Sequence, residues 1–495
     1  MYGSGIGIGG LASGLDSNSI IQKLVELESI PITQLGSKKK KVQDKLGQVG
    51  KLKGLVNDLK TKAKAVGTQS DFLVFDVKTS STGVASFSAT GSAAAANHTL
   101  TVNQLASIDR WAFDGTSSST TNLATGAGQT IDFSTNGHSY SVAIDQANSS
   151  LENIASQINT AAGADVTATV VNTGTTTVPS YKLVLTSDTS GQEGRIAGLT
   201  SSLGLLTIDG TGPDIAGHAV STNNISVGQN AIAVVDGLTV ERSTNDLNDV
   251  IAGISITAES ADPSLTINFS AEPNKSAIKV KINDLVSAYN AVITFINEQS
   301  KYSKDGGASG VLFGDSILSS VRNSVQKALF DVPLATVQND TTGYSTLSVI
   351  GINTQNDGTL KVDDTKLSNK IATNLDALAD LFVDKDGFDN GGATVNTPEY
   401  YQDTSADSGL ASSLTRSIDR MINLTNGSGG VVLKGLFDSR NESINRQIKD
   451  IDDQVVKKQA YIDKFQAELT ARFAKLESVM GGLNGQKSAL AASFN

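Results

Sequence analysis

The 495-residue chain contains no cysteine. This absence excludes disulfide bonds, thiolate nucleophiles and zinc sites built from cysteine. A chain without cysteine suits the cytosol, and it equally suits export through a narrow channel as an unfolded polypeptide. Composition therefore leaves both locations open.

Long apolar runs are also missing, because no stretch of eighteen apolar residues occurs anywhere in the sequence. We therefore predict no membrane-spanning helix. The N-terminal segment MYGSGIGIGGLASGLDS has neither the basic region nor the apolar region of a conventional signal peptide. If the protein is extracellular, we expect it to leave the cell by another route.

Residues that commonly carry catalysis are scarce. The three histidines (His98, His138 and His218) are dispersed, and neither an H-E-x-x-H nor a G-x-S-x-G motif is present. The glycines of Gly5–Gly10 match G-x-G-x-x-G, but no strand precedes them, so we do not interpret them as a nucleotide site. The segment Asp384–Asn390 lacks the spacing of a calcium loop and is interpreted as an acidic turn. We predict no enzyme, no cofactor and no metal site.

Charge is unevenly distributed. Residues 79–275 carry 5 basic and 17 acidic side chains, whereas residues 1–78 carry 12 and 7. The main basic cluster, Lys38–Lys41, has no aromatic residues among it and is interpreted as a solvated helix face. Because nucleic-acid binding needs clustered cations on a folded face, an acidic middle region argues against it.

A seven-residue apolar repeat marks the C-terminal region. One series begins at Ile448 and a second begins three residues later at Ile451, with cationic breaks at Lys458 and Arg472. This spacing is the a/d pattern of a coiled coil. A long narrow apolar seam cannot be buried by its own helix, so it requires a partner. The alternative interpretation is an ordinary helix of a larger bundle.

The N-terminal region offers that partner, because it carries two apolar series of the same period between Ile21 and Val66. We expect Asp16 to cap a helix here and Pro31 to interrupt it. The two terminal helices are then predicted to pack side by side and to bring the chain ends together.

The middle of the chain alternates apolar and polar residues, which predicts half-buried strands. Asp236-Gly237 lies between two alternating runs and predicts a tight hairpin. One helix is expected among the strands, with Ser149 and Glu152 as a capping box. The alternating positions are Leu100/Val102, Tyr140/Val142/Ile144, Val166/Ala168/Val170, Tyr181/Leu183/Leu185, Ile254/Ile256 and Leu265/Ile267/Phe269.

After Pro273 the helical period returns, with apolar positions at 278–296, 317–329 and 410–421 and a short β element formed by LSVIGI and GTLKV. The predicted fold class is α+β multidomain, with a terminal coiled-coil leg, an antiparallel helical bundle and inserted β-rich head domains. The predicted domains are a partly disordered N-terminal leg (1–42), a helical bundle (43–78 and 276–440), a β-rich head of two domains (79–275, with one inserted around 106–225) and a C-terminal leg (441–495).

Several segments together resemble the flagellar filament capping proteins. The resemblance begins at GLASGLDSNSIIQKLVELESIPITQL (10–35) and recurs at VVDGLTVERSTNDLNDVIAGISITAES (234–260). It continues through Lys279–Tyr302, GDSILSSVRNSVQKAL and LSVIGINTQNDGTLKVDDTKL, and returns at INRQIKDIDDQVVKKQAYIDKFQAELTARFAKLESVMGGLN. SSLENIASQINTAAGADVTATVV (149–171) is similar to a motif of flagellins and hook-associated proteins.

The resemblance implies an extracellular cap at the tip of the bacterial flagellum. It implies a ring-like homo-oligomer that holds exported flagellin until it folds and inserts, with no cleaved signal peptide because the flagellar secretion apparatus exports the chain. Implied partners are the chain itself, flagellin, hook-associated junction proteins and a cytoplasmic export chaperone at the C-terminal helix. The predicted assembly seam consists of Leu24, Leu35, Val42, Ile448, Ile451, Val455, Ile462, Phe465, Leu469, Leu476, Val479 and Leu483.

Two alternatives stay open from the sequence. Another axial flagellar protein (a flagellin or a hook–filament junction protein) would share coiled ends and a β-rich head. A secreted adhesin would use the Ser/Thr-rich head to bind glycans.

Overall fold

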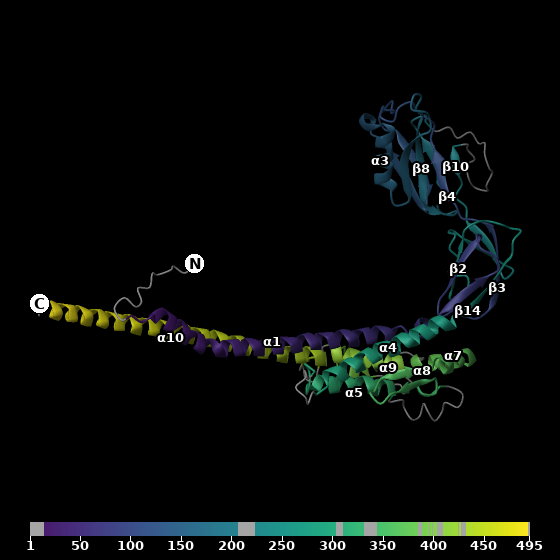
Figure 1. The fold of residues 1–495 in the computed structure, drawn as a ribbon. Helices are drawn as coiled ribbons and strands as arrows, with labels where there is room; N and C mark the ends of the chain where they lie inside the picture. Colours follow the sequence, from purple (N-terminus) through teal and green to yellow (C-terminus); the bar gives the residue numbers. More distant parts are fainter. Residues whose placement is uncertain are drawn as a thin grey trace. The chain divides into compact units, whose positions relative to one another are not determined.

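The computed structural model of the chain describes residues 14–205, 223–302, 310–330, 344–384, 389–395, 397, 399–402, 409–423, 425–426 and 432–493. These residues divide into two compact units (Figure 1). The helical unit combines residues up to Phe72 with residues from Lys279 onward, and the β unit spans residues 73–278. The β unit is therefore an insertion in the helical unit, as the predicted α+β fold class requires. Gly5–Gly10, His218 and residues 385–388 of the acidic turn lie outside the described residues.

The first long helix, α1, spans Ser17–Lys64. The Asp16 carboxylate accepts a hydrogen bond from the Ser19 backbone N–H at 3.0 Å, which confirms the predicted cap. The prediction that Pro31 interrupts this helix is wrong, because α1 continues through it. Proline removes one backbone hydrogen bond, but Ile21 and Val42 on either side are buried, and such packing stabilises a long helix more than local propensity does.

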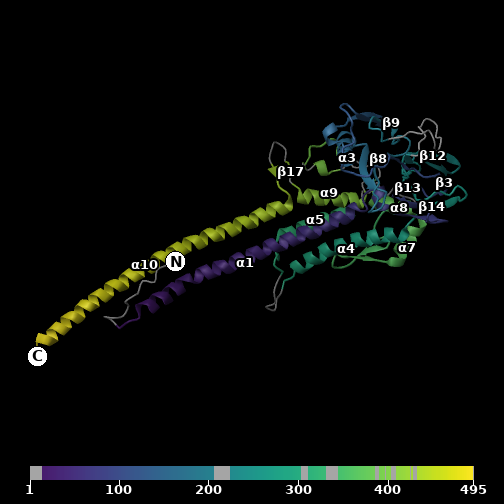
Figure 2. The same cartoon turned by 90° about the horizontal axis from the view of Figure 1, so that it is seen from above.

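The last helix, α10, spans Leu436–Ser493 and lies beside α1 in both views (Figures 1 and 2). Two ion pairs join them: Lys39 Nζ lies 2.6 Å from an Asp452 oxygen, and Lys53 Nζ lies 3.0 Å from an Asp438 oxygen. The lysines are fourteen residues apart and so are the aspartates, in the opposite order. The helices are therefore antiparallel, and they pack side by side as predicted. We call α1 and α10 the terminal helix pair.

The remaining helical unit packs shorter helices against this pair. The predicted helices at 278–296, 317–329 and 410–421 are present, and so is the short hairpin. Two helices that the sequence analysis did not predict begin at the side-chain caps Asp363 and Asn374. The elements are α2 (Gln69–Phe72), α4 (Lys275–Gln299), α5 (Ser316–Phe330), β15 (Ile352–Thr354), β16 (Leu360–Val362), α7 (Asp364–Thr373), α8 (Leu375–Phe382), η2 (Glu399–Tyr401), α9 (Leu410–Ile422), β17 (Thr425–Asn426) and β18 (Val432–Leu433).

In the β unit, a first core forms around Leu100. One sheet has the order β1-β14-β3-β11-β12, and β13 pairs separately with β2. Asp236 and Gly237 have φ values of 51° and 83°, the left-handed conformation that a tight hairpin turn needs, so the predicted hairpin is confirmed. The strands are β1 (Phe75–Thr79), β2 (Ala85–Ala89), β3 (Asn97–Gln104), β11 (Ala231–Val235), β12 (Leu238–Arg242), β13 (Ile254–Ala258) and β14 (Ile267–Pro273).

A second core forms around Trp111, between a sheet of order β10-β4-β8-β7, a sheet of order β6-β5-β9 and the helix α3. We call it the Trp111 core. Its elements are β4 (Ile108–Ala112), β5 (Thr130–Thr135), β6 (His138–Ala143), η1 (Gln146–Asn148), α3 (Leu151–Ala162), β7 (Val166–Asn172), β8 (Tyr181–Ser190), β9 (Ala197–Ser201) and β10 (Asn224–Ser226).

The predicted cap of α3 is displaced by one residue. The Ser150 hydroxyl, and not that of Ser149, accepts the hydrogen bond from the Asn153 backbone N–H. The Ser149 hydroxyl instead accepts hydrogen bonds from the backbone N–H groups of Leu123 and Ala124. A tertiary contact therefore decides between two neighbouring serines.

Candidate functional site

The twelve residues of the predicted assembly seam all lie on the terminal helix pair, but their exposure differs along it. Three are buried, namely Val42, Ile451 and Ile462. Five are half-buried, namely Leu35, Ile448, Val455, Phe465 and Leu469. Four are exposed, namely Leu24, Leu476, Val479 and Leu483. The seam is therefore closed within one chain over only part of its length.

The register of the pair explains why Leu476, Val479 and Leu483 are exposed. If the spacing of the two ion pairs is continued along both helices, Ser17 at the start of α1 lies opposite Ala474. Residues 476–493, which we call the distal segment, extend beyond that point, and Figure 1 shows α10 continuing past the start of α1. Leu476 is 43 % exposed and Val479 is 53 % exposed. The apolar repeat of α10 thus continues beyond the point where α1 begins.

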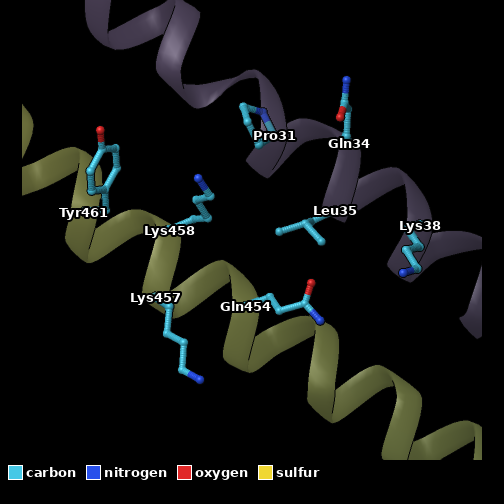
Figure 3. Close-up of a pocket in the computed structure, with 8 residues that line it drawn as sticks. All are labelled: Pro31, Gln34, Leu35, Lys38, Gln454, Lys457, Lys458 and Tyr461. Carbon is cyan, nitrogen blue, oxygen red and sulfur yellow. The ribbon is translucent and has the colours of Figure 1, made fainter.

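A groove also opens between the two helices within the paired part (Figure 3). Leu35 projects from α1 toward α10, and Lys458 projects from α10 into the space between them. Ile451 and Ile462 are buried on either side of this place, so the groove is a local opening in a closed seam. Its lining residues are Pro31, Gln34, Leu35, Lys38, Gln454, Lys457, Lys458 and Tyr461.

Lys458 accounts for this opening, since it occupies a position of the heptad repeat that an apolar residue would fill. Its ammonium lies 5.3 Å from the centroid of the Tyr461 ring, a cation–π geometry. Tyr461 in turn stacks on Phe465, with ring centroids 6.3 Å apart and planes inclined by 11°. Lys458, the cationic break in the apolar repeat, is therefore exposed, and the stacked rings of Tyr461 and Phe465 lie beside it.

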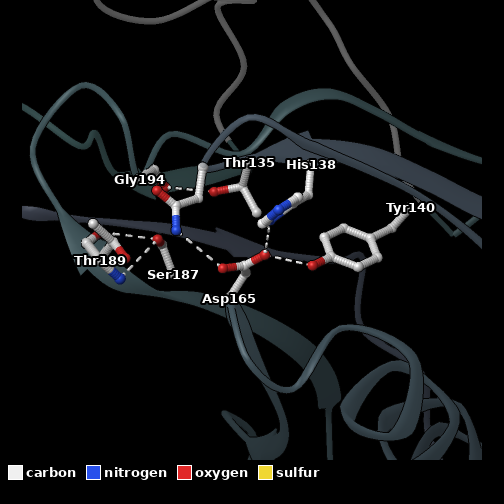
Figure 4. Close-up of polar contacts among 8 residues, drawn as sticks. Thr135, His138, Tyr140, Asp165, Ser187, Thr189 and Gly194 are labelled. Atoms are coloured by element: carbon white, nitrogen blue, oxygen red, sulfur yellow. Dashed lines mark hydrogen bonds and ion pairs between the residues drawn. The ribbon is translucent and has the colours of Figure 1, made fainter.

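A polar cluster in the β unit centres on Asp165 (Figure 4). Its carboxylate is hydrogen-bonded by the Tyr140 hydroxyl, by Asn136 Nδ2 at 3.1 Å and by His138 Nδ1 at 2.7 Å. Because these donors favour the ionised carboxylate, they lower the pKa of Asp165 to about 2. The nearby Ser187 hydroxyl donates to the Thr189 carbonyl at 2.9 Å, so its proton is not directed at His138. Serine, histidine and aspartate thus lie in one cluster without the chain of hydrogen bonds that a nucleophilic triad uses.

The most buried carboxylate of the Trp111 core is Asp109, which the sequence analysis did not single out. It accepts hydrogen bonds from the Trp111 indole at 2.9 Å, the Ile196 and Gly228 backbone N–H groups at 2.8 and 2.9 Å, and Asn224 Nδ2 at 3.1 Å. Four donors from segments up to 119 residues away surround one aspartate. No local pattern in the sequence could have predicted this arrangement.

The described residues contain neither a cluster suited to a metal ion nor a helix suited to a membrane. No group of three or more His, Asp or Glu side chains there is arranged to hold a metal ion. Within the same ranges, no helix combines the length and the apolar character that crossing a membrane requires.

The N- and C-terminal parts of the chain each match a family of known proteins. Residues 13–109 match the family described as flagellar hook-associated protein 2 N-terminus, and residues 228–485 match the family described as flagellar hook-associated protein 2 C-terminus. The second match alone covers more than half of the chain. The chain belongs to the flagellar hook-associated protein 2 family. This membership supports the resemblance drawn from the sequence and does not favour a flagellin or an adhesin.

Relatives and solved structures agree with this assignment. The B-type flagellar hook-associated protein 2 of Pseudomonas aeruginosa is 24% identical over 99% of this chain and 97% of its own length. Flagellar hook-associated protein 2 of Escherichia coli K12 is 26% identical over 98% of this chain and 97% of its own length. The crystal structure of the D1-D2-D3 domains of the flagellar cap protein FliD from Escherichia coli covers 80% of this chain and 99% of that chain, with a TM-score of 0.60 and 21% identity. That structural likeness supports the α+β multidomain fold.

Proposed function

We propose that the protein is a structural cap at the distal end of the bacterial flagellar filament, where it forms a homo-oligomer and promotes the folding and insertion of exported flagellin. The observation that carries this proposal is membership of the hook-associated protein 2 family. The likeness in fold to a solved flagellar cap protein adds support. The role is structural rather than catalytic.

In this proposal the terminal helix pair is the leg through which the cap assembles. The division into leg (1–42 and 441–495), bundle (43–78 and 276–440) and head (79–275) follows the change of pattern along the sequence. The distal segment supports the assignment, because its apolar stripe extends beyond the described part of α1, and an exposed apolar stripe favours association. Burying one leucine side chain contributes roughly 1.5–3 kcal/mol.

The remaining partners follow from the same role. We propose flagellin and the hook-associated junction proteins as neighbours at the filament tip. Before export, a cytoplasmic chaperone would cover the apolar stripe at the end of α10, and the flagellar secretion apparatus would carry the chain to the extracellular tip. Ring-like closure is the expected form of the oligomer, since repeated head-to-tail contacts must close to avoid open filaments.

Sedimentation and electron microscopy of the purified full-length chain test the assembly proposal, and complementation of a strain that lacks its own cap protein tests the function. Leu476→Asp should weaken self-association at least tenfold, because the leucine that the oligomer is proposed to bury is replaced by a charge that must be desolvated. Cells with this variant should release unpolymerised flagellin and grow few or short filaments.

Ser478→Asp is the matched control, since Ser478 is exposed on the same turn of α10 and lies off the apolar stripe. It introduces the same charge and should leave assembly unchanged. Normal filaments with Leu476→Asp, together with normal secretion of that variant, would exclude the distal segment as an assembly contact. Hydrogen exchange adds a second reading, because the distal segment should gain protection only in the oligomer.

A further inference from the structure

The charged residues that line the groove between α1 and α10 are all cations. Lys38, Lys457 and Lys458 line it, and none of its lining residues is acidic. Lys41 lines an adjoining hollow on α1. Within the described ranges, none of Lys38, Lys457 and Lys458 forms an ion pair with a carboxylate, whereas Lys39 beside them pairs with Asp452. The cations at the groove therefore repel one another without internal compensation.

Both helices also contribute apolar or aromatic residues to the lining of the groove. Pro31 and the half-buried Leu35 contribute from α1, and Tyr461 contributes from α10. On α1 an exposed apolar ridge leads into the groove along the same face, because Ile20, Leu24, Leu27 and Pro31 follow one another at spacings of four, three and four. Leu27 is 64 % exposed. Residues at these spacings line one side of a helix and form a ridge against which another helix packs.

We propose that this groove binds a third α-helix whose apolar ridge is flanked by carboxylates. A helix fits this groove, because α1 and α10 lie side by side as its two walls. The spaces between their side chains accept the side chains of a third helix packed along them. Carboxylates beside the ridge would meet the lysines that line the groove and remove their mutual repulsion. This inference deepens the assembly proposal by giving the chemistry of a partner that the terminal helix pair takes.

Two designed peptides of about 21 residues, or six helical turns, serve as probes. Both carry leucine at the a and d positions, and they differ only in having glutamate or lysine at every flanking position. Fluorescence anisotropy with the full-length protein at about 50 mM salt measures both affinities under conditions where screening is weak. The glutamate peptide should bind at least about tenfold more tightly than the lysine peptide, and the difference should shrink in high salt.

Charge reversal on both walls should invert this selectivity. In Lys38→Glu/Lys458→Glu, the lysine peptide should become the tighter ligand, and a gain of binding can arise only from a folded groove. Lys449→Glu/Lys475→Glu is the matched control, because both lysines are exposed on α10 outside the groove and the net charge changes equally. It should keep the preference for the glutamate peptide.

Equal binding of the two peptides, no binding of either, or an equal loss of selectivity in the control would overturn the inference. Self-association of the same proteins separates it from the assembly proposal. A chain that forms oligomers but does not select the acidic peptide loses only this inference. A chain that stays monomeric but selects the acidic peptide loses only the assembly proposal.

Discussion

The Trp111 core and the terminal helix pair differ in whether side chains that are costly to leave unpaired or exposed find their contacts within the chain. In the Trp111 core, the buried carboxylate of Asp109 receives hydrogen bonds from four donors of the same chain. On α10, Leu476 and Val479 continue the apolar stripe of the paired part into solvent. Among the described residues, the buried charge of the β unit has its hydrogen-bond donors within the chain, whereas the helix pair exposes apolar side chains and cations that a partner can cover.

This difference indicates where folding ends and assembly begins. A group that is satisfied inside the chain contributes to the stability of the monomer, so its loss should appear as unfolding. A group that is exposed in the chain should leave the monomer stable, and its loss should appear only when a partner is present. Substitutions in the two regions therefore test whether the monomer and the assembly depend on different residues.

The largest effect on stability is expected from Asp109→Ala. The change removes the carboxylate that accepts hydrogen bonds from the Trp111 indole and two backbone N–H groups, and removing one partner of a buried charged network costs about 3–5 kcal/mol. Trp111 is the single tryptophan of the chain, so its fluorescence in urea reports this core. Asp188→Ala, at an exposed position of β8, is the control and should change little. A loss below about 1 kcal/mol with Asp109→Ala would contradict the role given to the network.

A smaller loss of monomer stability is expected when apolar side chains of the seam on α10 are truncated to alanine, and the loss should depend on the position. Ile462 is 2 % exposed and packs within the pair, so Ile462→Ala should lower the stability of the monomer by about 2–4 kcal/mol. Leu476→Ala lies two heptads further along the helix and should change it by no more than about 0.5 kcal/mol. Helix content during thermal unfolding of the monomer measures both. Equal losses at the two positions would show that the distal segment is already covered within the chain.

Removal of the α1 cap should have a local effect. Asp16→Ala leaves the Ser19 backbone N–H without its acceptor, which costs about 1 kcal/mol of helix stability. Hydrogen exchange should increase in the first turn of α1 and not beyond Val42. Asp16→Asn keeps an acceptor at this position and should retain most of the protection.

The smallest expected effect is a decrease in the stability of the Trp111 core at acid pH. Because the pKa of Asp165 is lowered to about 2 from an unfolded value near 3.9, its contribution to stability is fully present above about pH 4 and is lost as the pH falls toward 2. The unfolding midpoint of the Trp111 core should therefore decrease over this range in the unaltered chain. Asp165→Asn should be less stable at neutral pH and should show a shallower decrease. Parallel curves for the two proteins would exclude the Asp165 cluster as the acid-sensitive group.

Where local chemistry decides the structure, the sequence predicted it well. Asp236-Gly237 forms the expected turn because left-handed backbone at both positions is what this residue pair supports. The alternating apolar residues lie in strands, except that Ile144 directly follows β6 and Leu265 lies two residues before β14. The heptad repeat also placed the terminal helices together, since period alone defines which face needs a partner.

Where distant contacts decide, the sequence was insufficient. The helix α1 continues through Pro31 because it packs against α10. Ser149 does not cap α3 because its hydroxyl accepts hydrogen bonds from the backbone N–H groups of Leu123 and Ala124. Asp109 has no signature because its donors come from separate segments of the chain. The groove was closer to being predictable, since Lys458 at an apolar heptad position already marked the place where the pair opens.

The two ion pairs of the terminal helix pair have one more consequence, which concerns slippage. An apolar repeat of seven residues is nearly unchanged when one helix slides by seven, so the seam alone permits several alignments. A slide in one direction would bring Lys39 opposite Gln459 and Lys53 opposite Asn445, and both pairs, worth up to about 1 kcal/mol each, would be lost. The ion pairs of the two lysines therefore favour one alignment of the helices over the others. They thereby set, in steps of about 10 Å, how much of α10 is left over for other molecules.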